Sequence, residues 1–213
     1  MGTIVKMGQR ELELGGPHLT ELRESTDVAD RPEELRRRMQ EDGYLFIRGF
    51  HDRNKVAAAR RSFLERIAAQ GKLDASAPID EGVIGEGNKA ANFHGSHEQP
   101  QPFLDLVNAP ETIAFFDRFL GGPSMTFDYK WARAIGTGEF TGAHYDIVYM
   151  GRGTPNLYTL WTPLGDISYA MGGLAILIES AGMDKVKATY GRMDVYRDRV
   201  AGAFSDDPLE VIG

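Results

Sequence analysis

The first half of the chain carries apolar residues at helical spacing. Asp30 and Asp52 each precede such a segment and suit the N-cap position, because their carboxylates can accept hydrogen bonds from the first free backbone amides. Glycine stands where each periodic segment stops, as is common just after a helix. The pattern predicts three helices, over residues 30–43, 52–71 and 110–120, with Ile113, Phe116 and Phe119 facing inward in the third.

Two segments between these helices lack the helical period. Residues 44–50 form a short apolar run between glycines, which predicts a buried strand. Residues 72–102 are rich in Gly, Pro, Asn and Asp and predict a long loop, which inside a domain is usually functional or mobile. Two histidines in this loop, His94 and His97, raise the question of a metal site. Their spacing matches neither a helical zinc motif nor a zinc finger.

After residue 123 the pattern changes to short apolar or alternating runs separated by glycine and proline turns. Runs of this length and spacing are typical of an antiparallel sandwich or barrel such as a jelly roll. The final part of the chain is charged and predicts a surface excursion anchored by Tyr190, Tyr196 and Phe204. The predicted strands cover residues 125–135, 141–149, 156–162 and 173–178.

The 141–149 run contains the residues with the clearest chemical potential, His144 and Asp146. On a strand, side chains two positions apart point to the same face, so these two should project together. An imidazole and a carboxylate side by side supply two of the three ligands in the 2-His-1-carboxylate triad that binds Fe(II). The alternative is a histidine that simply hydrogen-bonds an aspartate, because His-x-Asp alone is a common sequence.

Composition narrows the classes of function. The 213 residues suit one domain, and 42% hydrophobic residues suffice for a core. The net charge of −7 argues against a nucleic-acid partner, and the basic run at residues 36–38 is interpreted as a solvated helix face. The absence of cysteine excludes disulfides and thiol ligands. With no signal-peptide core and no apolar run of membrane length, we expect a soluble, cytoplasmic protein with no membrane partner.

Several segments, in this order, resemble the phytanoyl-CoA dioxygenase family of Fe(II)/2-oxoglutarate-dependent oxygenases. The resemblance covers roughly residues 31–180. It rests on the Asp-Gly-Tyr-Leu-Phe-Ile-Arg-Gly-Phe run at 42–50, the helix after it, His144-Tyr145-Asp146, Trp-Thr-Pro-Leu-Gly-Asp at 161–166, and Gly-Gly-Leu-Ala-Ile-Leu at 172–177.

The resemblance implies a double-stranded β-helix, or jelly roll, with helices packed on it. It divides the chain into an N-terminal helical part (1–123), jelly-roll strands (124–180) and the charged excursion (181–213). It also implies that His144 and Asp146 bind Fe(II), that Trp161 and Lys89 contact the co-substrate 2-oxoglutarate, and that O₂ is consumed. Asp146 favours hydroxylation of an unactivated C–H in a small organic molecule, because halogenating relatives have a small residue in its place.

The chain departs from the family pattern in three ways. No histidine follows His144, although the family's third iron ligand lies downstream, and no arginine on a recognisable strand replaces the one that pairs with 2-oxoglutarate. The family's Ser-His after the Gly-Gly-Leu strand is Ser180-Ala181 here. The simplest interpretation is that the chain stops before the last core strands, so these 213 residues alone should have little activity. Two alternatives remain: a catalytically dead jelly-roll binding protein, and a metal site completed by His94 or His97.

Overall fold

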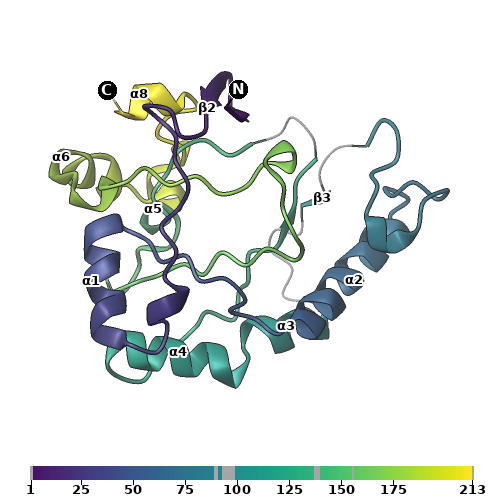
Figure 1. Cartoon of the computed structure of the whole chain (residues 1–213), viewed down its shortest axis with the longest axis horizontal. Coiled ribbons are helices and arrows are strands. Elements are labelled where there is room, and N and C mark those ends of the chain that lie inside the picture. Colours follow the sequence, from purple (N-terminus) through teal and green to yellow (C-terminus); the bar gives the residue numbers. More distant parts are fainter. Residues whose placement is uncertain (1, 89–90, 93–98, 137–139, 155, 213) are drawn as a thin grey trace.

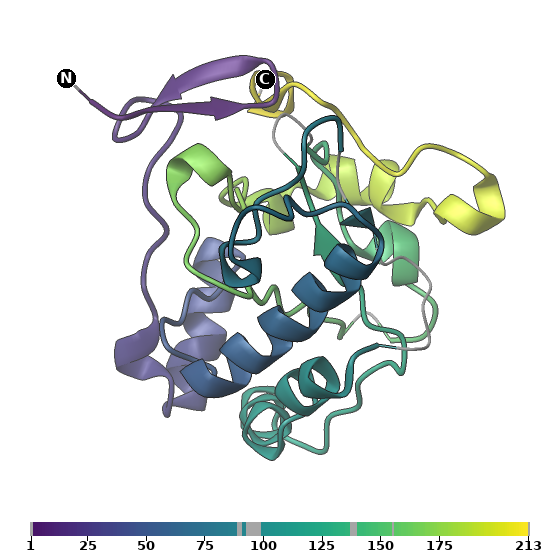
Figure 2. The same ribbon diagram turned by 90° about the vertical axis from the view of Figure 1, so that its right-hand side faces the viewer.

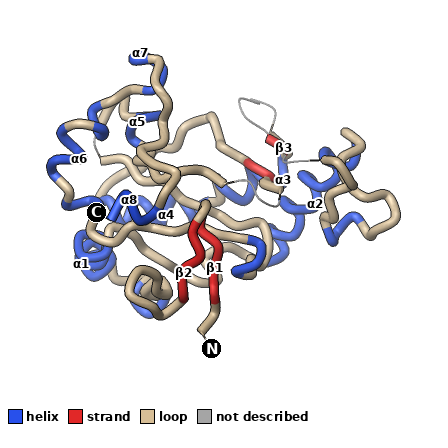
Figure 3. The backbone as a smooth tube through the Cα atoms, turned by 90° about the horizontal axis from the view of Figure 1, so that it is seen from above, coloured by secondary structure: helices blue, strands red, loops and turns tan. Residues whose placement is uncertain are grey.

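The computed structural model describes residues 2–88, 91–92, 99–136, 140–154 and 156–212, which form a mixed molecule of helices, short strands and long coil (Figures 1 and 3). The strands in these residues make two antiparallel pairs. β1 (Ile4–Met7) pairs with β2 (Arg10–Glu13), and β3 (Ala91–Asn92) pairs with β4 (Arg133–Ala134). The first pair forms a hairpin near the C-terminal residues (Figure 2).

All three predicted helices are present, with small corrections at their ends. They are α1 (Pro32–Asp42), α2 (Arg53–Ala69) and α4 (Pro110–Leu120). Arg31, not Asp30, occupies the N-cap position of α1, and Gly43 ends that helix in the left-handed conformation at φ 79°. Such a backbone angle favours glycine because it has no Cβ. The further helices are α3 (Gln101–Val107), α5 (Ile147–Met150), α6 (Asp184–Ala188), α7 (Val195–Asp198) and α8 (Pro208–Ile212).

Two apolar clusters hold the helices together. In the first, α2 packs on α3, and the rings of Phe63 and Phe103 meet edge to face at 5.1 Å around the fully buried Leu106. In the second, α1 packs on α4 through Leu35, Phe115 and their neighbours. Phe119 is buried as predicted, whereas Ile113 and Phe116 are only half-buried, and Phe115 takes the deeper place on α4.

The basic run on α1 is not uniformly solvated, which corrects the sequence interpretation. Arg37 lies on the exposed side and pairs with glutamates of its own helix. Arg38 is buried, and its guanidinium donates to both carboxylate oxygens of Asp27 at 2.9 and 3.0 Å and to the Glu24 carbonyl at 2.7 Å. The hydrogen bond from Arg38 lowers the pKa of Asp27. Arg38 therefore fastens α1 to the segment before it.

The predicted strands of the second half are wrong for the described structure. Residues 156–162 and 173–178 are coil, residues 125–135 contribute only the two-residue β4, and residues 147–150 form helix α5. Residues 44–50 make a single bridge, between Glu24 and Phe46. A strand is stable only when a neighbour pairs with its backbone. Because such neighbours are missing around these segments, the described residues show no jelly roll.

The charged C-terminal part is more structured than predicted. It contains α6, α7 and α8 and packs on the segment around His144 through Tyr190, which is buried. Tyr196 and Phe204 are exposed and are weaker anchors than predicted. Within the described part of the chain, no helix combines the length and apolar character needed to cross a membrane.

The N-cap of α2 gives a first testable prediction. The Asp52 carboxylate accepts hydrogen bonds from the amides of Asn54 and Lys55 at 2.9 and 3.0 Å. Asp52→Ala should therefore lower the free energy of unfolding by about 1 kcal/mol, as loss of a helix cap usually does. Urea unfolding would measure it, with Asp30→Ala as the matched control because Asp30 is not the cap of α1. Equal losses in both variants would contradict the assignment.

His51, which precedes α2, predicts a pH dependence of stability. Burial lowers the pKa of its imidazole, and its Nε2 lies 3.2 Å from Thr162 Oγ1. The unfolded chain then takes up a proton near the ordinary histidine pKa of about 6.5 while the folded chain resists it. The contribution of His51 is thus complete above that pH and is lost as the pH falls below it. The difference between the urea midpoints at pH 7.5 and pH 5.5 should be smaller in His51→Gln than in the parent. An equal difference in the two proteins would contradict this.

Candidate metal centre

His144 and Asp146 lie together, as their spacing predicted, although not on a strand. His144 Nε2 is 3.3 Å from Asp146 Oδ1. The backbone pairs once, between Ala143 and Ser205, and then turns, with Asp146 in the helical region at φ −60°, ψ −29° ahead of α5. The turn, and not an extended strand, brings the two side chains to the same place.

Hydrogen bonds fix the orientation of the imidazole. His144 Nδ1 lies 2.8 Å from the Gly142 carbonyl. Since a carbonyl only accepts, Nδ1 carries the proton of that bond. Nε2 then donates to Asp146 when the ring is protonated and offers its lone pair to a metal ion when the ring is neutral. The hydrogen bond with Asp146 raises the pKa of His144, while burial opposes the rise. This arrangement matches that of metal-binding histidines, whose second ring nitrogen is usually held by a carbonyl or carboxylate.

The carboxylate of Asp146 is held in its ionised form. Its hydrogen bond with His144 lowers its pKa most, and a further hydrogen bond from the Thr159 side chain acts in the same direction against burial. An ionised carboxylate is the form that binds a cation. Thr159 was not predicted as a site residue, because a threonine within an apolar run carries no signal of its own.

Aromatic side chains cover one side of the pair. The rings of His144 and Tyr149 meet edge to face at 5.5 Å, and Tyr149 meets Trp131 in the same way at 5.5 Å. A side chain on Gly202 would collide with the Tyr149 hydroxyl, so this close approach requires glycine. The ring of Tyr149 thereby links the candidate centre to the segment before β4 and to the C-terminal part.

The C-terminal part also supports the turn that carries the pair. The Tyr145 hydroxyl donates to the Ser180 carbonyl at 2.7 Å, and the Tyr145 amide donates to the Tyr190 hydroxyl at 3.3 Å. The Tyr190 hydroxyl in turn donates to the Gly202 carbonyl. Sequence reasoning identified Tyr190 as an anchor without showing what it anchors, because the pairing spans 45 positions.

Of the other predicted site residues, the structure describes Trp161, which is not joined to the pair. Trp161 lies in coil and is 48% exposed. Lys89, His94 and His97 lie outside the described residues. Among the residues whose placement is described, no group of three or more histidine and acidic side chains could hold a metal ion.

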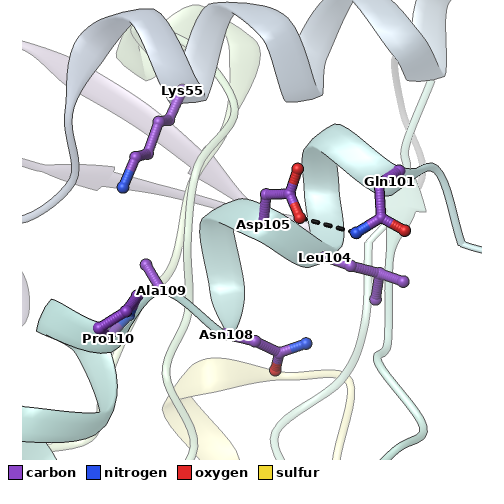
Figure 4. Close-up of a pocket in the computed structure, with 7 residues that line it drawn as sticks. All are labelled: Lys55, Gln101, Leu104, Asp105, Asn108, Ala109 and Pro110. Carbon is purple, nitrogen blue, oxygen red and sulfur yellow. Dashed lines mark hydrogen bonds between the residues drawn. The ribbon is translucent and has the colours of Figure 1, made fainter.

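A separate pocket of about 440 Å³ lies between α2, α3 and the start of α4 (Figure 4). Two of the residues that line it contact each other, since the side-chain amide of Gln101 donates to the Asp105 carboxylate at 2.7 Å. It contains none of the predicted site residues. Its lining residues are Lys55, Gln101, Leu104, Asp105, Asn108, Ala109 and Pro110.

The model of the phytanoyl-CoA dioxygenase (PhyH) family matches residues 39–198, which include the His144–Asp146 turn, Thr159 and Tyr190. The chain belongs to the PhyH family. No solved structure gives a significant match.

Two curated relatives are hydroxylases. The 1-deoxypentalenic acid 11-beta-hydroxylase of Streptomyces exfoliatus is 31% identical over 167 residues, 74% of this chain and 57% of the relative. The enzyme of the same name from Streptomyces arenae is 29% identical over 160 residues, 71% of this chain and 55% of the relative. The chain thus spans little more than half the length of the relatives it matches. Membership of the PhyH family and these relatives support an oxygenase or hydroxylase role.

Proposed function

We propose that this PhyH chain carries part of the centre of an Fe(II)/2-oxoglutarate-dependent dioxygenase that hydroxylates a C–H bond of a small organic molecule. The relatives' names give 1-deoxypentalenic acid as one such molecule. When bound, iron would activate O₂ with 2-oxoglutarate as co-substrate. We further propose a cytoplasmic location and a jelly-roll core in the complete fold.

The observation that carries the proposal is the 3.3 Å between His144 Nε2 and Asp146 Oδ1. Nitrogen and oxygen ligands lie about 2.0–2.2 Å from a divalent ion such as zinc, so two of them at right angles are roughly 3 Å apart. The two atoms therefore need little movement to share an ion, which would take the place of the hydrogen bond between them. The donor set, one imidazole and one carboxylate, fits iron of the facial-triad kind.

The surrounding residues would position the two ligands. The Gly142 carbonyl directs His144 Nε2 toward the ion, and Thr159 holds the ionised Asp146. Tyr149 shields the imidazole on one side. Trp161 and Lys89 are proposed to contact 2-oxoglutarate, on the family resemblance alone. A third ligand and the arginine for 2-oxoglutarate have no counterpart among the residues assigned here, so the 213 residues alone should turn over little 2-oxoglutarate.

A chimera tests the proposal. The part of the Streptomyces exfoliatus hydroxylase outside the matched region would be joined to this chain, and succinate release would be measured with Fe(II), 2-oxoglutarate and ascorbate. The chimera should release succinate, and His144→Ala or Asp146→Ala should reduce release to background, while the exposed His18→Ala should not. Release that survives His144→Ala would contradict the ligand assignment. A chimera that folds but releases no succinate would favour a non-catalytic binding protein.

A further inference from the structure

Arg133 carries a guanidinium beside the candidate centre that has no part in holding His144 or Asp146. It lies on β4, where its backbone pairs with Asn92 of β3. Its side chain is exposed, and one terminal nitrogen donates to Thr141 Oγ1 at 2.8 Å. Thr141 stands three residues before His144. The hydrogen bond therefore holds the guanidinium against the segment that leads into the turn with the His144–Asp146 pair.

Two further observations place Arg133 near the pair. The ring of Trp131, two residues earlier, meets the Tyr149 ring at 5.5 Å, and the Tyr149 ring meets that of His144 at the same distance. The hydrogen bond with Asp146 raises the pKa of His144, and burial raises the pKa of Tyr149, while the positive charge of Arg133 opposes both rises. Because such charge effects fall with distance, a molecule bound beside His144 is within reach of this guanidinium.

Arg133 has no carboxylate partner in the described part of the chain. Its one side-chain hydrogen bond there goes to Thr141, a neutral acceptor. Arg38 and Arg152, by contrast, each donate to both oxygens of an aspartate. The other N–H groups of Arg133 remain available, and so does the hydroxyl proton of Thr141, which only accepts in this bond. In a chain of net charge −7, such a guanidinium is a local attraction for an anion.

Apolar side chains flank this cation. Trp131 and Ile135 stand two positions to either side of Arg133 and are 38% and 47% exposed. Side chains two positions apart along an extended chain point to the same face, and the contact of Trp131 with Tyr149 puts that face on the side of His144. A charged group with exposed apolar neighbours suits a ligand that has one anionic end and an apolar body.

We propose that Arg133 and Thr141 bind the carboxylate of a substrate that is an organic acid with an apolar body. The planar guanidinium matches the two oxygens of a carboxylate, and the Thr141 hydroxyl adds a donor. The apolar body would lie over Trp131, toward His144 and Asp146. A small dicarboxylate such as 2-oxoglutarate has little apolar surface to cover Trp131 and is the competing ligand. That the acid is a substrate rests on the proposed function, whereas the anion site itself does not.

The test is an NMR titration of the full, ¹⁵N-labelled chain with naphthalene-2-carboxylate, without metal. The acid should shift the side-chain Nε–H signal of Arg133 and the indole N–H signal of Trp131. Arg133→Gln should weaken binding at least about fivefold, because a charge-assisted pair is lost, and Arg133→Lys should weaken it less. The neutral naphthalene-2-carboxamide should bind the parent at least about fivefold more weakly than the acid. Arg118→Gln, which removes an exposed arginine of α4, is the matched control and should stay within about twofold of the parent.

Three results would overturn the proposal. The acid could leave the signals of Arg133 and Trp131 in the parent unshifted. The parent and Arg133→Gln could bind the acid equally, or the parent could bind acid and amide equally, which would show that the carboxylate is not recognised. Arg133→Gln could weaken the binding of 2-oxoglutarate and leave that of naphthalene-2-carboxylate unchanged, which would assign Arg133 to the co-substrate. Because neither metal binding nor succinate release is measured, these failures are distinct from failure of the proposed catalytic role.

Discussion

His144→Ala should weaken the binding of a divalent first-row ion by at least about 100-fold. Loss of an outer-shell partner of a metal ligand already costs about 10–100-fold in affinity, and His144 would be a ligand itself. Two protein ligands are proposed here, so removing one leaves Asp146 to hold the ion alone. The binding of Co(II), a stable substitute for Fe(II), can be followed by calorimetry with the purified chain.

The control for this experiment is His18→Ala. His18 is exposed and lies in the coil after β2, so its loss should leave affinity within about twofold of the parent. The Co(II) affinity of Thr159→Val should lie between those of His18→Ala and His144→Ala, because this change removes a hydrogen bond to Asp146 but no ligand. Equal affinity in the parent and in His144→Ala would show that the ion binds elsewhere and would remove the basis for the catalytic proposal.

Leu106→Ala should cost about 2–5 kcal/mol of unfolding free energy. Leu106 is fully buried where α3 packs on α2, and truncation of a buried leucine removes apolar contacts and leaves a cavity. Total stabilities of small domains are about 5–15 kcal/mol, so this loss should be a large fraction of the total. Urea unfolding followed by circular dichroism would measure the loss.

The matched control is Leu160→Ala in the coil at residues 156–162. Leu160 is 38% exposed in coil, so its truncation should cost less than about 0.5 kcal/mol. The contrast between the two leucines tests where the folded core lies. If Leu160→Ala destabilised the isolated chain as much as Leu106→Ala, the segment around Leu160 would be packed in solution and the core would extend beyond the two helical clusters.

The helices could be predicted from sequence because their signals are local. Asp52 caps α2 through amides two and three positions away, and Gly43 ends α1 by its own backbone angle. Each of these contacts lies within one turn of the residue that signals it. The error at Asp30 has the same scale, since the true N-cap is the next residue. α3 was missed because it is short and lies beside a loop rich in breakers.

The sequence alone could not show whether the predicted strands form, because a strand depends on a partner that can lie far away in the sequence. Residues 156–162 have the composition of a strand but no described neighbour to pair with. Residues 147–150 are β-branched and aromatic, yet they form α5 because the chain turns at Asp146. Local propensity is a weak guide where pairing is absent.

The candidate centre was predictable in part. His144 and Asp146 are close because they are two positions apart, which sequence can show. Their supports are not local: Thr159 reaches Asp146, and Tyr190 reaches Tyr145 from the C-terminal part. The chemistry of such residues, one hydroxyl each, gives no signal in a single sequence.

The most direct test of the account is to locate a bound ion. Crystals of the chain would be grown with Mn(II) and measured for anomalous scattering. The ligand preferences of Mn(II) are close enough to those of Fe(II) for it to report the site. The account predicts a peak within about 2.0–2.4 Å of both His144 Nε2 and Asp146 Oδ1. A peak bound elsewhere, or none at these two atoms at saturating Mn(II), would contradict the assignment of this turn as the metal centre.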